Sequence, residues 1–582
     1  MNALKSSIFV YDLVTLPLYY IFQRPWRKRR RAKAIRATSS RENDPSSIWR
    51  PVGKAKQNIT DNCDLVDAYF KRMVKIYGSK RCLGVRDTVH EEEEVQSDGK
   101  VFKKKILAPN YRWYTYSQID KRIDDVTRGL LLSGVKPKEK VIIFAETRLE
   151  WMITFLALMR LGAVVSTLYA TLGEESIIYG INQLQSSCIV TTSELLPKVK
   201  KILDKAPSLK LIINIEDNFS KSKNDYSKQV DNDNVTVVSF AELESKGSEA
   251  SPDLKGEPHS PDDVALIMYT SGSTGVPKGV LITNKNVMAT QKGCYLIGKD
   301  WKSSKEDAKY IAFLPLAHIM ELTAELFFLS MGLGIGYSSP LTLSDRSPGI
   351  KQGSLGDIAV LRPAAMTGVP LVIEKIRKGV LDQVKARGKF FKQFFDFAII
   401  YKSYWFEKGY NTPLLDFLLF RKIKAGFGGN LEVWLSGGAP LSPESQAFLR
   451  ACLGVKMLLG YGATETCGGA CISNLYDRST GRVGAPLLGV YLKLIPWEEG
   501  NYNPTDKPNP RGEIIIGGDC VSLGYYKNDE QTKEDFWQDE HGIRWFKTGD
   551  IGELFPDGTL KIIDRRKDLI KLQQGEYVSL GK

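Results

Sequence analysis

Histidine and cysteine are scarce in this sequence, and their scarcity limits the metal chemistry that it can support. The 582 residues include four histidines and eight cysteines, and no two cysteines have C-x-x-C spacing. Cys467 and Cys471 are the nearest pair. Structural zinc sites need clusters of these two residue types, so we expect no zinc site. Reduced cysteines that face the cytosol are the simplest interpretation.

Acidic residues are missing from one basic stretch near the N-terminus. Nine lysines and arginines lie between Arg24 and Arg41, without an aspartate or glutamate. Because the formal net charge of the chain is +14, all its other residues together carry about +5. That excess is ordinary for a protein of this size, so we expect no nucleic-acid partner.

The apolar run before this basic stretch is short for a membrane span. Ile8–Phe22 has 15 residues and is interrupted by Asp12 and Pro17, whereas a spanning helix needs ~20 apolar residues. A secretory signal carries its positive charge before the apolar run, and here the charge follows it. We interpret residues 1–35 as a membrane anchor, either a short signal-anchor or an interfacial helix, with the remaining chain on the cytosolic side. The alternative is an apolar helix buried in the globule.

A loop rich in glycine and hydroxyl groups follows one apolar strand in the middle of the chain. The run Val264-Ala-Leu-Ile-Met268 predicts a buried strand. It leads into Tyr269-Thr-Ser-Gly-Ser-Thr-Gly-Val-Pro-Lys278-Gly279. Glycine lets backbone N–H groups approach a ligand closely, and hydroxyls with a lysine suit phosphate oxygens. The spacing differs from G-x-x-x-x-G-K-[ST]. We therefore predict a polyphosphate-binding loop of another type, with a Ser/Gly surface turn as the alternative.

Strand and helix patterns alternate over residues 140–215. Strands are expected at 140–145, 163–168, 188–192 and 211–215, and helices at 149–161, 174–185 and 195–206. This alternation favours an α/β fold with parallel sheets flanked by helices. A helix is also expected at 64–80, whereas the acidic run 91–94 and the polar stretches 36–60, 220–234 and 244–263 are interpreted as loops or linkers.

Four further segments carry polar or charged residues after apolar strands or at a charged turn. They are Ser436-Gly-Gly-Ala-Pro440, Gly460-Tyr-Gly-Ala-Thr-Glu465, Thr548-Gly-Asp550 and Asp564-Arg-Arg-Lys-Asp568. Together with the phosphate loop, and in this order, they resemble the motifs of the adenylate-forming superfamily. That family activates carboxylates with ATP, giving an acyl-adenylate and pyrophosphate.

The resemblance implies a role for each matching residue. Glu465 would help to hold Mg²⁺ together with Thr270, Tyr461 would stack on adenine, and Asp550 would bind the ribose hydroxyls. His318 aligns with a motif close to the reacting carboxylate and phosphate, although a lone histidine is more often a core residue. Lys571 matches a lysine of the thioester-forming arrangement. The other residues expected at the nucleotide are Ser271, Gly272, Ser273, Thr274, Gly275, Lys278, Gly438, Ala439, Pro440, Thr464 and Arg565.

Several stretches are similar to one subgroup, the long-chain acyl-CoA synthetases of types three and four. They are residues 543–567, 315–321, 336–340 and 575–580. The resemblance covers residues 60–582 and implies ATP, Mg²⁺, coenzyme A and a long-chain fatty acid as cofactor and substrates. Two positions depart from relatives: Leu322 stands where a bacterial relative has a tryptophan gate, and Ala463 stands where leucine is common.

The resemblance also implies a division of the chain. Residues 61–564 correspond to the large adenylate-forming domain, and residues 565–582 to a hinge and the start of a small C-terminal domain. Family members continue for over a hundred residues beyond that point, so we expect the activity of this chain to be impaired by the missing domain. The endoplasmic reticulum is the expected location, with the mitochondrial outer membrane and lipid droplets as alternatives.

Three questions stay open at the level of sequence. The acid could be that of another ligase in the superfamily, for coumarate or medium-chain acids. The chain could also be a non-catalytic, membrane-anchored protein that binds ATP or fatty acid. Finally, the aromatic and basic stretch Lys389–Phe406 could pack against the sheet or face a membrane beside the entrance for the acyl chain. No oligomeric state is predicted.

Overall fold

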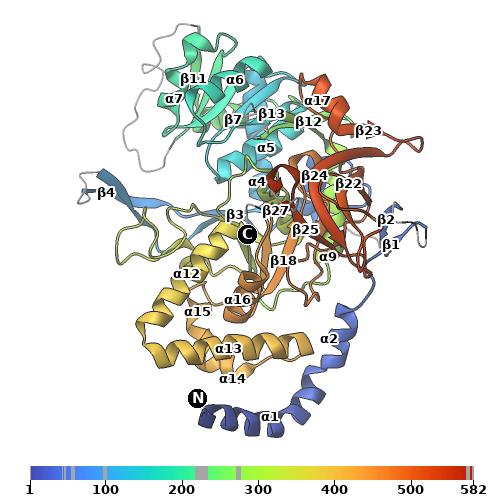
Figure 1. The fold of residues 1–582 in the computed structure, drawn as a ribbon. Coiled ribbons are helices and arrows are strands. Elements are labelled where there is room, and N and C mark those ends of the chain that lie inside the picture. The colour runs from blue at the N-terminus through green and yellow to red at the C-terminus, as the bar shows by residue number, and fades with distance from the viewer. Residues whose placement is uncertain are drawn as a thin grey trace.

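A computed structural model defines the fold of this chain (Figure 1). It describes residues 2–41, 44, 47–53, 59–95, 101–216, 234–257, 259–270, 277–571 and 577–579. Two large, mainly parallel sheets and one antiparallel sheet lie among helices. The predicted α/β fold class is confirmed.

The first sheet contains the predicted alternation of strands and helices. Its order is β11-β10-β9-β7-β8-β12-β13, and every neighbouring pair is parallel except β12 with β13. The central strands β7, β8, β9, β10 and β12 are buried, mostly apolar runs, as expected for a sheet covered on both faces. The strands are β7 (Lys140–Phe144), β8 (Val164–Thr167), β9 (Cys188–Thr192), β10 (Leu211–Ile215), β11 (Thr236–Ser239), β12 (Val264–Thr270) and β13 (Lys278–Thr283). The accompanying helices are α4 (Tyr116–Leu132), α5 (Leu149–Leu161), α6 (Glu174–Leu184), α7 (Leu196–Lys200) and α8 (Phe240–Glu249).

The second sheet has the order β20-β19-β18-β17-β16-β14-β15-β3-β6. Its strands from β18 to β3 are parallel, so their carboxyl ends meet at one edge. The strands are β3 (Arg81–Val85), β6 (Arg112–Thr115), β14 (Lys309–Ala312), β15 (Gly334–Tyr337), β16 (Ala365–Thr367), β17 (Val433–Ser436), β18 (Lys456–Tyr461), β19 (Cys471–Ile472) and β20 (Ala485–Pro486). The helices are α3 (Val66–Tyr77), α9 (Asn284–Gly298), α10 (Ile319–Ser330), α11 (Asp357–Leu361) and α16 (Pro443–Leu453).

The third sheet is antiparallel and includes part of the predicted linker. Its order is β1-β2-β21-β22-β24-β23, with β25 also paired to β24. The strands are β1 (Ala37–Ser39), β2 (Trp49–Pro51), β21 (Val490–Ile495), β22 (Arg511–Gly518), β23 (Phe536–Gln538), β24 (Arg544–Leu554) and β25 (Leu560–Arg565), and α17 (Asp529–Asp535) precedes β23. Because β1 and β2 pair with each other and β2 pairs with β21, residues 36–60 are not simply a linker.

Three local expectations were wrong. The acidic run 91–94 lies in β4 (Thr88–Val95), which forms a hairpin with β5 (Val101–Leu107), because lysines 103–105 stand opposite the glutamates and offset their charge. The helix expected at 195–206 is α7 followed by a separate 3-10 turn at Leu203–Lys205. The polar stretch 244–263 begins inside α8, whose N-cap Ser239 accepts a hydrogen bond from the backbone of Glu242.

A small hairpin of β26 (Leu569–Lys571) and β27 (Tyr577–Ser579) ends the described chain.

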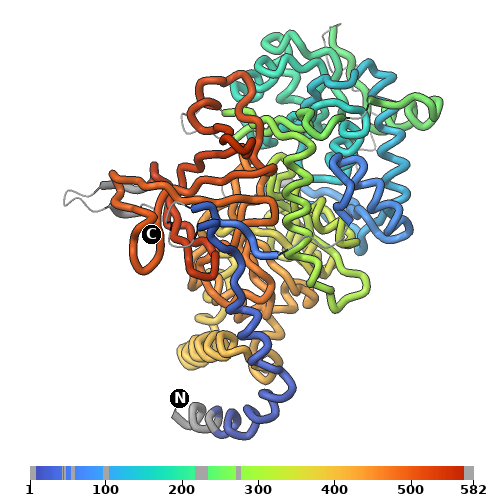
Figure 2. Tube along the Cα trace, turned by 90° about the vertical axis from the view of Figure 1, so that its right-hand side faces the viewer, coloured from blue at the N-terminus to red at the C-terminus, as the bar shows by residue number. Residues whose placement is uncertain are grey.

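The helices at one end of the molecule come from two distant parts of the chain. Figures 1 and 2 place α1 (Asn2–Gln23) and α2 (Pro25–Ala32) beside α13 (Lys389–Lys408) at this end. The other elements there are α12 (Pro370–Ala386), α14 (Pro413–Leu415), a π-helical turn at Asp416–Phe420, and α15 (Arg421–Ala425). Among the described helices, none has the length and apolar character required to cross a bilayer.

Two glutamates of α10 are completely buried. Glu321 accepts hydrogen bonds from the Tyr310 hydroxyl at 3.0 and 2.9 Å, and Glu325 accepts one from the Tyr337 hydroxyl at 2.8 Å. Burial raises the pKa of Glu325 from 4.5 to about 8, and burial together with the nearby Glu325 raises that of Glu321. This end of α10 therefore becomes less stable when its carboxyl groups ionise.

The buried carboxyl of Glu325 should make stability depend on pH. The pKa of Glu325 is higher in the folded protein, so its contribution is largest below about 4.5 and is lost as the pH rises to about 8. Thermal unfolding of Glu325→Gln should lack this loss. Relative to the variant, the wild type should lose several kcal/mol of unfolding free energy between pH 5 and pH 8, since one pKa unit corresponds to about 1.4 kcal/mol. Glu540→Gln, at an exposed position, is the control, and parallel pH curves for wild type and Glu325→Gln would contradict the prediction.

Candidate active site

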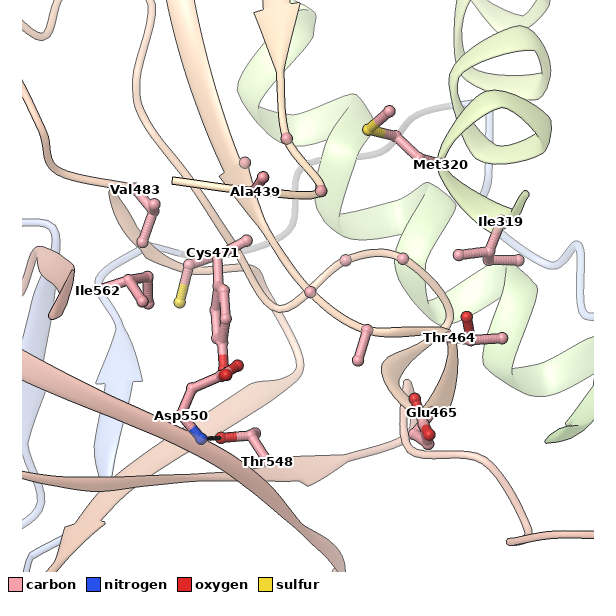
Figure 3. Close-up of a pocket in the computed structure, with 18 of the residues that line it drawn as sticks. Ile319, Met320, Ala439, Thr464, Glu465, Cys471, Val483, Thr548, Asp550 and Ile562 are labelled. Carbon is pink, nitrogen blue, oxygen red and sulfur yellow. Dashed lines mark hydrogen bonds between the residues drawn. The ribbon is translucent and has the colours of Figure 1, made fainter. Parts of the chain in front are cut away.

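One cavity of about 1440 Å³ collects residues from all three sheets. Its walls include the ends of β12, β17 and β18, the start of α10, and parts of β24 and β25 (Figure 3). Eleven residues named from the sequence line it: Thr270, Lys278, His318, Gly438, Ala439, Pro440, Tyr461, Thr464, Glu465, Asp550 and Arg565. Residues as far apart in the chain as Thr270 and Arg565 thus share one site.

The remaining predicted residues lie at the edge of the described structure or outside it. Ser271, Gly272, Ser273, Thr274 and Gly275 lie outside the described residues. The two ends of their loop are defined, because Thr270 and Lys278 are partners across β12 and β13. Lys571 pairs through its backbone with Tyr577 in the terminal hairpin, and its side chain is not among the described ones.

Tyr461 and Asp550 form one polar corner of the cavity. Tyr461, at the end of β18, donates a hydrogen bond from its hydroxyl to Asp550 Oδ2 at 2.7 Å. Arg565 Nε lies 3.5 Å from Asp550 Oδ1, because Arg565 and Asp550 are register partners in β25 and β24. Burial raises the pKa of Asp550, while the hydrogen bond from Tyr461 and the charge of Arg565 act against that rise. The corner therefore presents one oriented carboxylate beside an aromatic ring (Figure 3).

A glycine-rich turn after β17 forms the neighbouring wall. Gly437 packs so closely that a Cβ atom would lie 3.2 Å from Met320 Sδ and 3.3 Å from the carbonyl oxygen of Gly460. Gly438 has φ +82°, a backbone conformation that residues with side chains rarely adopt. Both glycines keep the backbone close to the cavity, next to Ala439 and Pro440.

Glu465 belongs to a charged cluster with two residues, Tyr525 and Asp535, that were not predicted from the sequence. The Tyr525 hydroxyl lies 2.9 Å from Glu465 Oε1 and 3.1 Å from Asp535 Oδ2. Lys278 Nζ lies 5.0 Å from the centre of the Tyr525 ring. Nothing in the spacing of Gly524-Tyr-Tyr526 marks Tyr525, and Asp535 ends a short polar helix that resembles any solvated surface helix. Only the fold brings them to Glu465.

The cluster has more negative charge than its hydrogen bonds can balance. Burial raises the pKa of Glu465, Asp535 adds to the rise, and the Tyr525 hydrogen bond and Lys278 oppose it. Burial also raises the pKa of Asp535. A tyrosine hydroxyl has one proton, so it cannot donate fully to both carboxylates. Paired oxygen ligands of this kind suit a hard divalent cation such as Mg²⁺.

Tyr525 should position Glu465 and keep it ionised. The Tyr525→Phe variant removes a hydrogen bond that lowers the pKa of Glu465, so the acidic limb of the pH–rate profile should move to higher pH. At neutral pH the rate of the reaction at this site should fall about tenfold, the size expected for a lost hydrogen bond to a charged group. Tyr526→Phe, in the adjacent residue, is the control. An unchanged pH profile would contradict a positioning role for Tyr525.

His318 has both a structural and a cavity-facing position. It caps α10, and its Nδ1 accepts a hydrogen bond from the backbone N–H of Met320 at 3.1 Å. Burial lowers the pKa of His318, so the neutral ring is favoured. With Nδ1 acting as an acceptor, the ring proton belongs on Nε2. His318 is therefore a neutral hydrogen-bond donor at the cavity wall.

The cavity continues into an apolar branch between two helices. Cys294, Ile297 and Gly298 line it from α9, and Ala324, Phe327 and Phe328 line it from α10. Gly298 permits this close approach, because a Cβ atom there would lie 2.2 Å from Phe327 Cζ. No sequence motif indicated this branch. Through this branch, the cavity that contains the polar corner and the charged cluster also offers a surface suited to an alkyl chain.

Comparisons with known proteins identify the family. The family model for the AMP-binding enzyme matches residues 93–526. Long chain acyl-CoA synthetase 8 of Arabidopsis thaliana is 44% identical over 526 residues, which cover 88% of this chain and 71% of the relative. Fatty acyl-CoA synthetase B of Dictyostelium discoideum is 34% identical over 522 residues, which cover 89% of this chain and 72% of that protein.

Solved structures share the fold. The adenylation domain of a carboxylate reductase from Mycobacterium chelonae superposes with a TM-score of 0.70 at 24% identity, over 90% of this chain and 75% of that one. A long-chain-fatty-acid–CoA ligase from Archaeoglobus fulgidus gives a TM-score of 0.62 at 18% identity, over 89% and 86% of the two chains. The chain belongs to the AMP-binding enzyme family and, within it, to the long-chain acyl-CoA synthetases.

Proposed function

We propose that this chain activates long-chain fatty acids with ATP and transfers them to coenzyme A. The fatty carboxylate attacks the α-phosphate of ATP, which gives an acyl-adenylate and releases pyrophosphate. The thiol of coenzyme A then attacks the acyl carbon and releases AMP. The observation that carries the proposal is the continuity of one cavity, in which an apolar branch between α9 and α10 meets a polar corner and a charged cluster.

The polar corner would hold the nucleoside. The Asp550 carboxylate can accept hydrogen bonds from both ribose hydroxyls, and the ring of Tyr461 offers a flat surface for adenine. The backbone of Gly438, Ala439 and Pro440 closes the adjacent wall. Fixing the nucleotide in this way orients the α-phosphate for attack.

The charged cluster would offset the repulsion between the carboxylate of the fatty acid and the phosphates of ATP. Lys278 supplies a positive charge, and the Thr270 hydroxyl and the 271–275 loop would supply further phosphate contacts. His318 would donate a hydrogen bond from Nε2–H to the fatty carboxylate or the phosphate. Glu465, Asp535 and Thr270 offer the oxygen ligands for Mg²⁺, whose chemistry when bound is to neutralise the phosphate charge. Thr464 lies beside Glu465 at the same wall.

The end of the described chain would serve the second step. Residues 565–582 begin where β25 ends, and a 3-10 turn at Arg566–Asp568 leads to the hairpin that contains Lys571. A turn between two small elements suits a hinge, and Lys571 would contribute to thioester formation after rotation. The domain boundary at residue 564 stays a prediction.

We also propose that residues 1–35 bring the enzyme to a membrane. Since none of the described helices is both long and apolar enough to span a bilayer, α1 would lie in the interface, with the basic α2 beside anionic head groups. The endoplasmic reticulum stays the predicted compartment.

Formation of acyl-CoA from defined acids tests the proposed reaction. The full chain should convert oleate, ATP and coenzyme A to oleoyl-CoA and AMP in equal amounts, and should not use coumarate. Product formation with coumarate alone would establish the alternative ligase. Binding of ATP without any acyl-CoA product would favour the non-catalytic alternative.

A further inference from the structure

Exposed apolar side chains are concentrated in two segments of the molecule. Of 25 large hydrophobic side chains that are exposed among the described residues, 14 belong to residues 10–26 and 390–418. These segments make up less than a tenth of the chain. Large exposed apolar clusters mark sites that contact another apolar phase or partner.

Helix α1 has its apolar face turned away from the protein. Its exposed side chains, Val10, Leu13, Val14, Leu18 and Ile21, recur at the spacing of one helical face. Most of the partly buried positions instead carry polar groups: Tyr11, Asp12, Thr15, Tyr19 and Gln23, whereas Ile8 and Leu16 are the apolar ones. This is the reverse of an amphipathic helix that packs on a water-soluble protein. The alternative prediction for residues 1–35, an apolar helix buried in the globule, is therefore wrong.

A second apolar surface comes from the body of the enzyme. On α13, Phe390, Ile400 and Tyr404 are exposed along one face, and the π-helical turn that follows exposes Phe417 and Leu418, each 63% exposed. The other side of α13 is anchored in the core through Phe395 and Ala398. One face of Lys389–Phe406 thus packs against the core, as one alternative predicts, and the opposite face is exposed, whereas its contact with a membrane stays a prediction.

Polar contacts fix the two surfaces side by side. The Tyr401 hydroxyl donates to Asp12 Oδ1, and the Gln23 side chain makes two hydrogen bonds with the backbone of Asn411, at 3.1 and 2.5 Å. Gly409 lies against Pro25, so that a Cβ atom there would be 2.9 Å from Pro25 Cα. Asp12 and Gln23 thus connect α1 to α13 and to the segment that follows it, while the apolar side chains of α1 named above stay exposed. Figures 1 and 2 show α1 beside α13.

Positive charge borders this apolar surface. Arg24, Arg27, Arg29 and Arg30 are exposed and form no ion pair with any residue in the described ranges. Residues 389–424 contain seven basic and three acidic residues, and the Arg421 guanidinium lies 5.2 Å from the Phe417 ring centre. Lys392 and Lys402 form ion pairs with Asp396 and Asp416, so the exposed arginines of residues 24–30 supply most of the unpaired charge. Apolar side chains beside such arginines match the acyl and head-group layers of an anionic bilayer.

We propose that α13 and the π-helical turn form, together with α1, one face that docks in the plane of an anionic phospholipid bilayer. The proposal rests on the membrane association proposed for residues 1–35 and extends it to the enzyme body. Phe417 and Leu418 would enter the acyl layer beside α1, and the arginines of α2 would contact head groups. The catalytic body would then be held by two elements rather than by a single N-terminal tether.

Vesicle sedimentation of the full chain tests this face. The probes are phosphatidylcholine vesicles with and without 30% phosphatidylserine. The body variant is Phe417→Ser with Leu418→Ser, and the helix variant is Leu13→Ser with Val14→Ser. Leu341→Ser with Leu355→Ser is the control, because these leucines are also exposed, by 57% and 55%, but lie elsewhere. Circular dichroism and unchanged thermal midpoints establish that each variant folds.

Each of the two face variants should lower the partition coefficient on anionic vesicles about tenfold, and the control should leave it unchanged. Loss in the helix variant alone would overturn the role of the body while leaving the N-terminal association intact. If both variants bind vesicles as well as the wild type does, neither the enzyme body nor α1 contributes to membrane docking. Equal binding to neutral and anionic vesicles would contradict the role of the basic residues. The wild type could also form a dimer in the absence of lipid, and both variants could be monomers. In that case a second copy of the chain, and not lipid, would occupy this face.

Discussion

Replacing Glu465 with glutamine should lower the rate of acyl-adenylate formation by roughly 10³-fold and leave the protein folded. The carboxylate lines the cavity wall, where desolvation and the nearby Asp535 raise its pKa. Glutamine keeps the shape and can still accept a hydrogen bond from Tyr525, but it removes the charge that suits a divalent cation. The rate is measured as oleate-dependent exchange of pyrophosphate into ATP.

A matched variant separates this effect from a general change in the cavity. Glu499 is an exposed glutamate that lines the same cavity, and Glu499→Gln should retain exchange within about twofold. Glu465→Gln should also need a higher Mg²⁺ concentration for half-maximal exchange. Near-normal exchange in Glu465→Gln would remove Glu465 from the proposed chemistry.

Replacing Asp550 with alanine should lower kcat/KM for ATP by roughly 10²- to 10³-fold. The carboxylate is the proposed acceptor for two ribose hydroxyls, and each hydrogen bond to a charged group contributes about 1.5–3 kcal/mol. The variant also leaves the Tyr461 hydroxyl without its acceptor. Most of the loss should fall on KM, because ribose contacts are made before and during the reaction. Initial rates at varied ATP concentration measure it.

Tyr461→Phe is the control for Asp550→Ala. It removes the hydroxyl that donates to Asp550 but keeps the aromatic ring, so kcat/KM for ATP should fall less than tenfold. If Asp550→Ala leaves kcat/KM for ATP unchanged while Tyr461→Phe lowers it, the ribose contact is assigned to the wrong residue.

The parts of the site that follow strands could be predicted from the sequence. Lys278, Gly438, Tyr461 and Asp550 each stand in a short motif in or just after a strand, and the fold brings these segments to one cavity. The resemblance of these motifs to a known family assigned their roles. Gly438 and Tyr461 also stand at or just after the ends of parallel strands, whose carboxyl ends share an edge where ligands bind, whereas Lys278 and Asp550 lie in antiparallel strand pairs.

The residues that support those motifs could not be predicted. Tyr525 and Asp535 have ordinary local sequences. Only the backbone pairing of residues 523–526 with β13, and the position of α17, bring their side chains to Glu465 and Lys278. The apolar branch has the same origin, since α9 and α10 carry no motif that distinguishes a cavity wall from a core.

Two segments of the chain depend on a partner segment in the fold. The glutamates of β4 form a strand because lysines of β5 stand across the hairpin, a partner that composition alone does not reveal. The polar face of α1 is explained by Tyr401 and Asn411, nearly four hundred residues away. Sequence periodicity locates such a face but does not identify its partner.

Binding of a stable acyl-adenylate analogue tests the central proposal most directly. Isothermal titration of the full chain with 5′-O-(N-oleoylsulfamoyl)adenosine should give one site per chain. The acetyl analogue should bind at least about 100-fold more weakly, because each buried methylene contributes about 0.8 kcal/mol, and Asp550→Ala should weaken the binding of both analogues. Equal affinity for the two analogues, or no binding of the oleoyl compound, would contradict a cavity that joins nucleotide and long acyl chain.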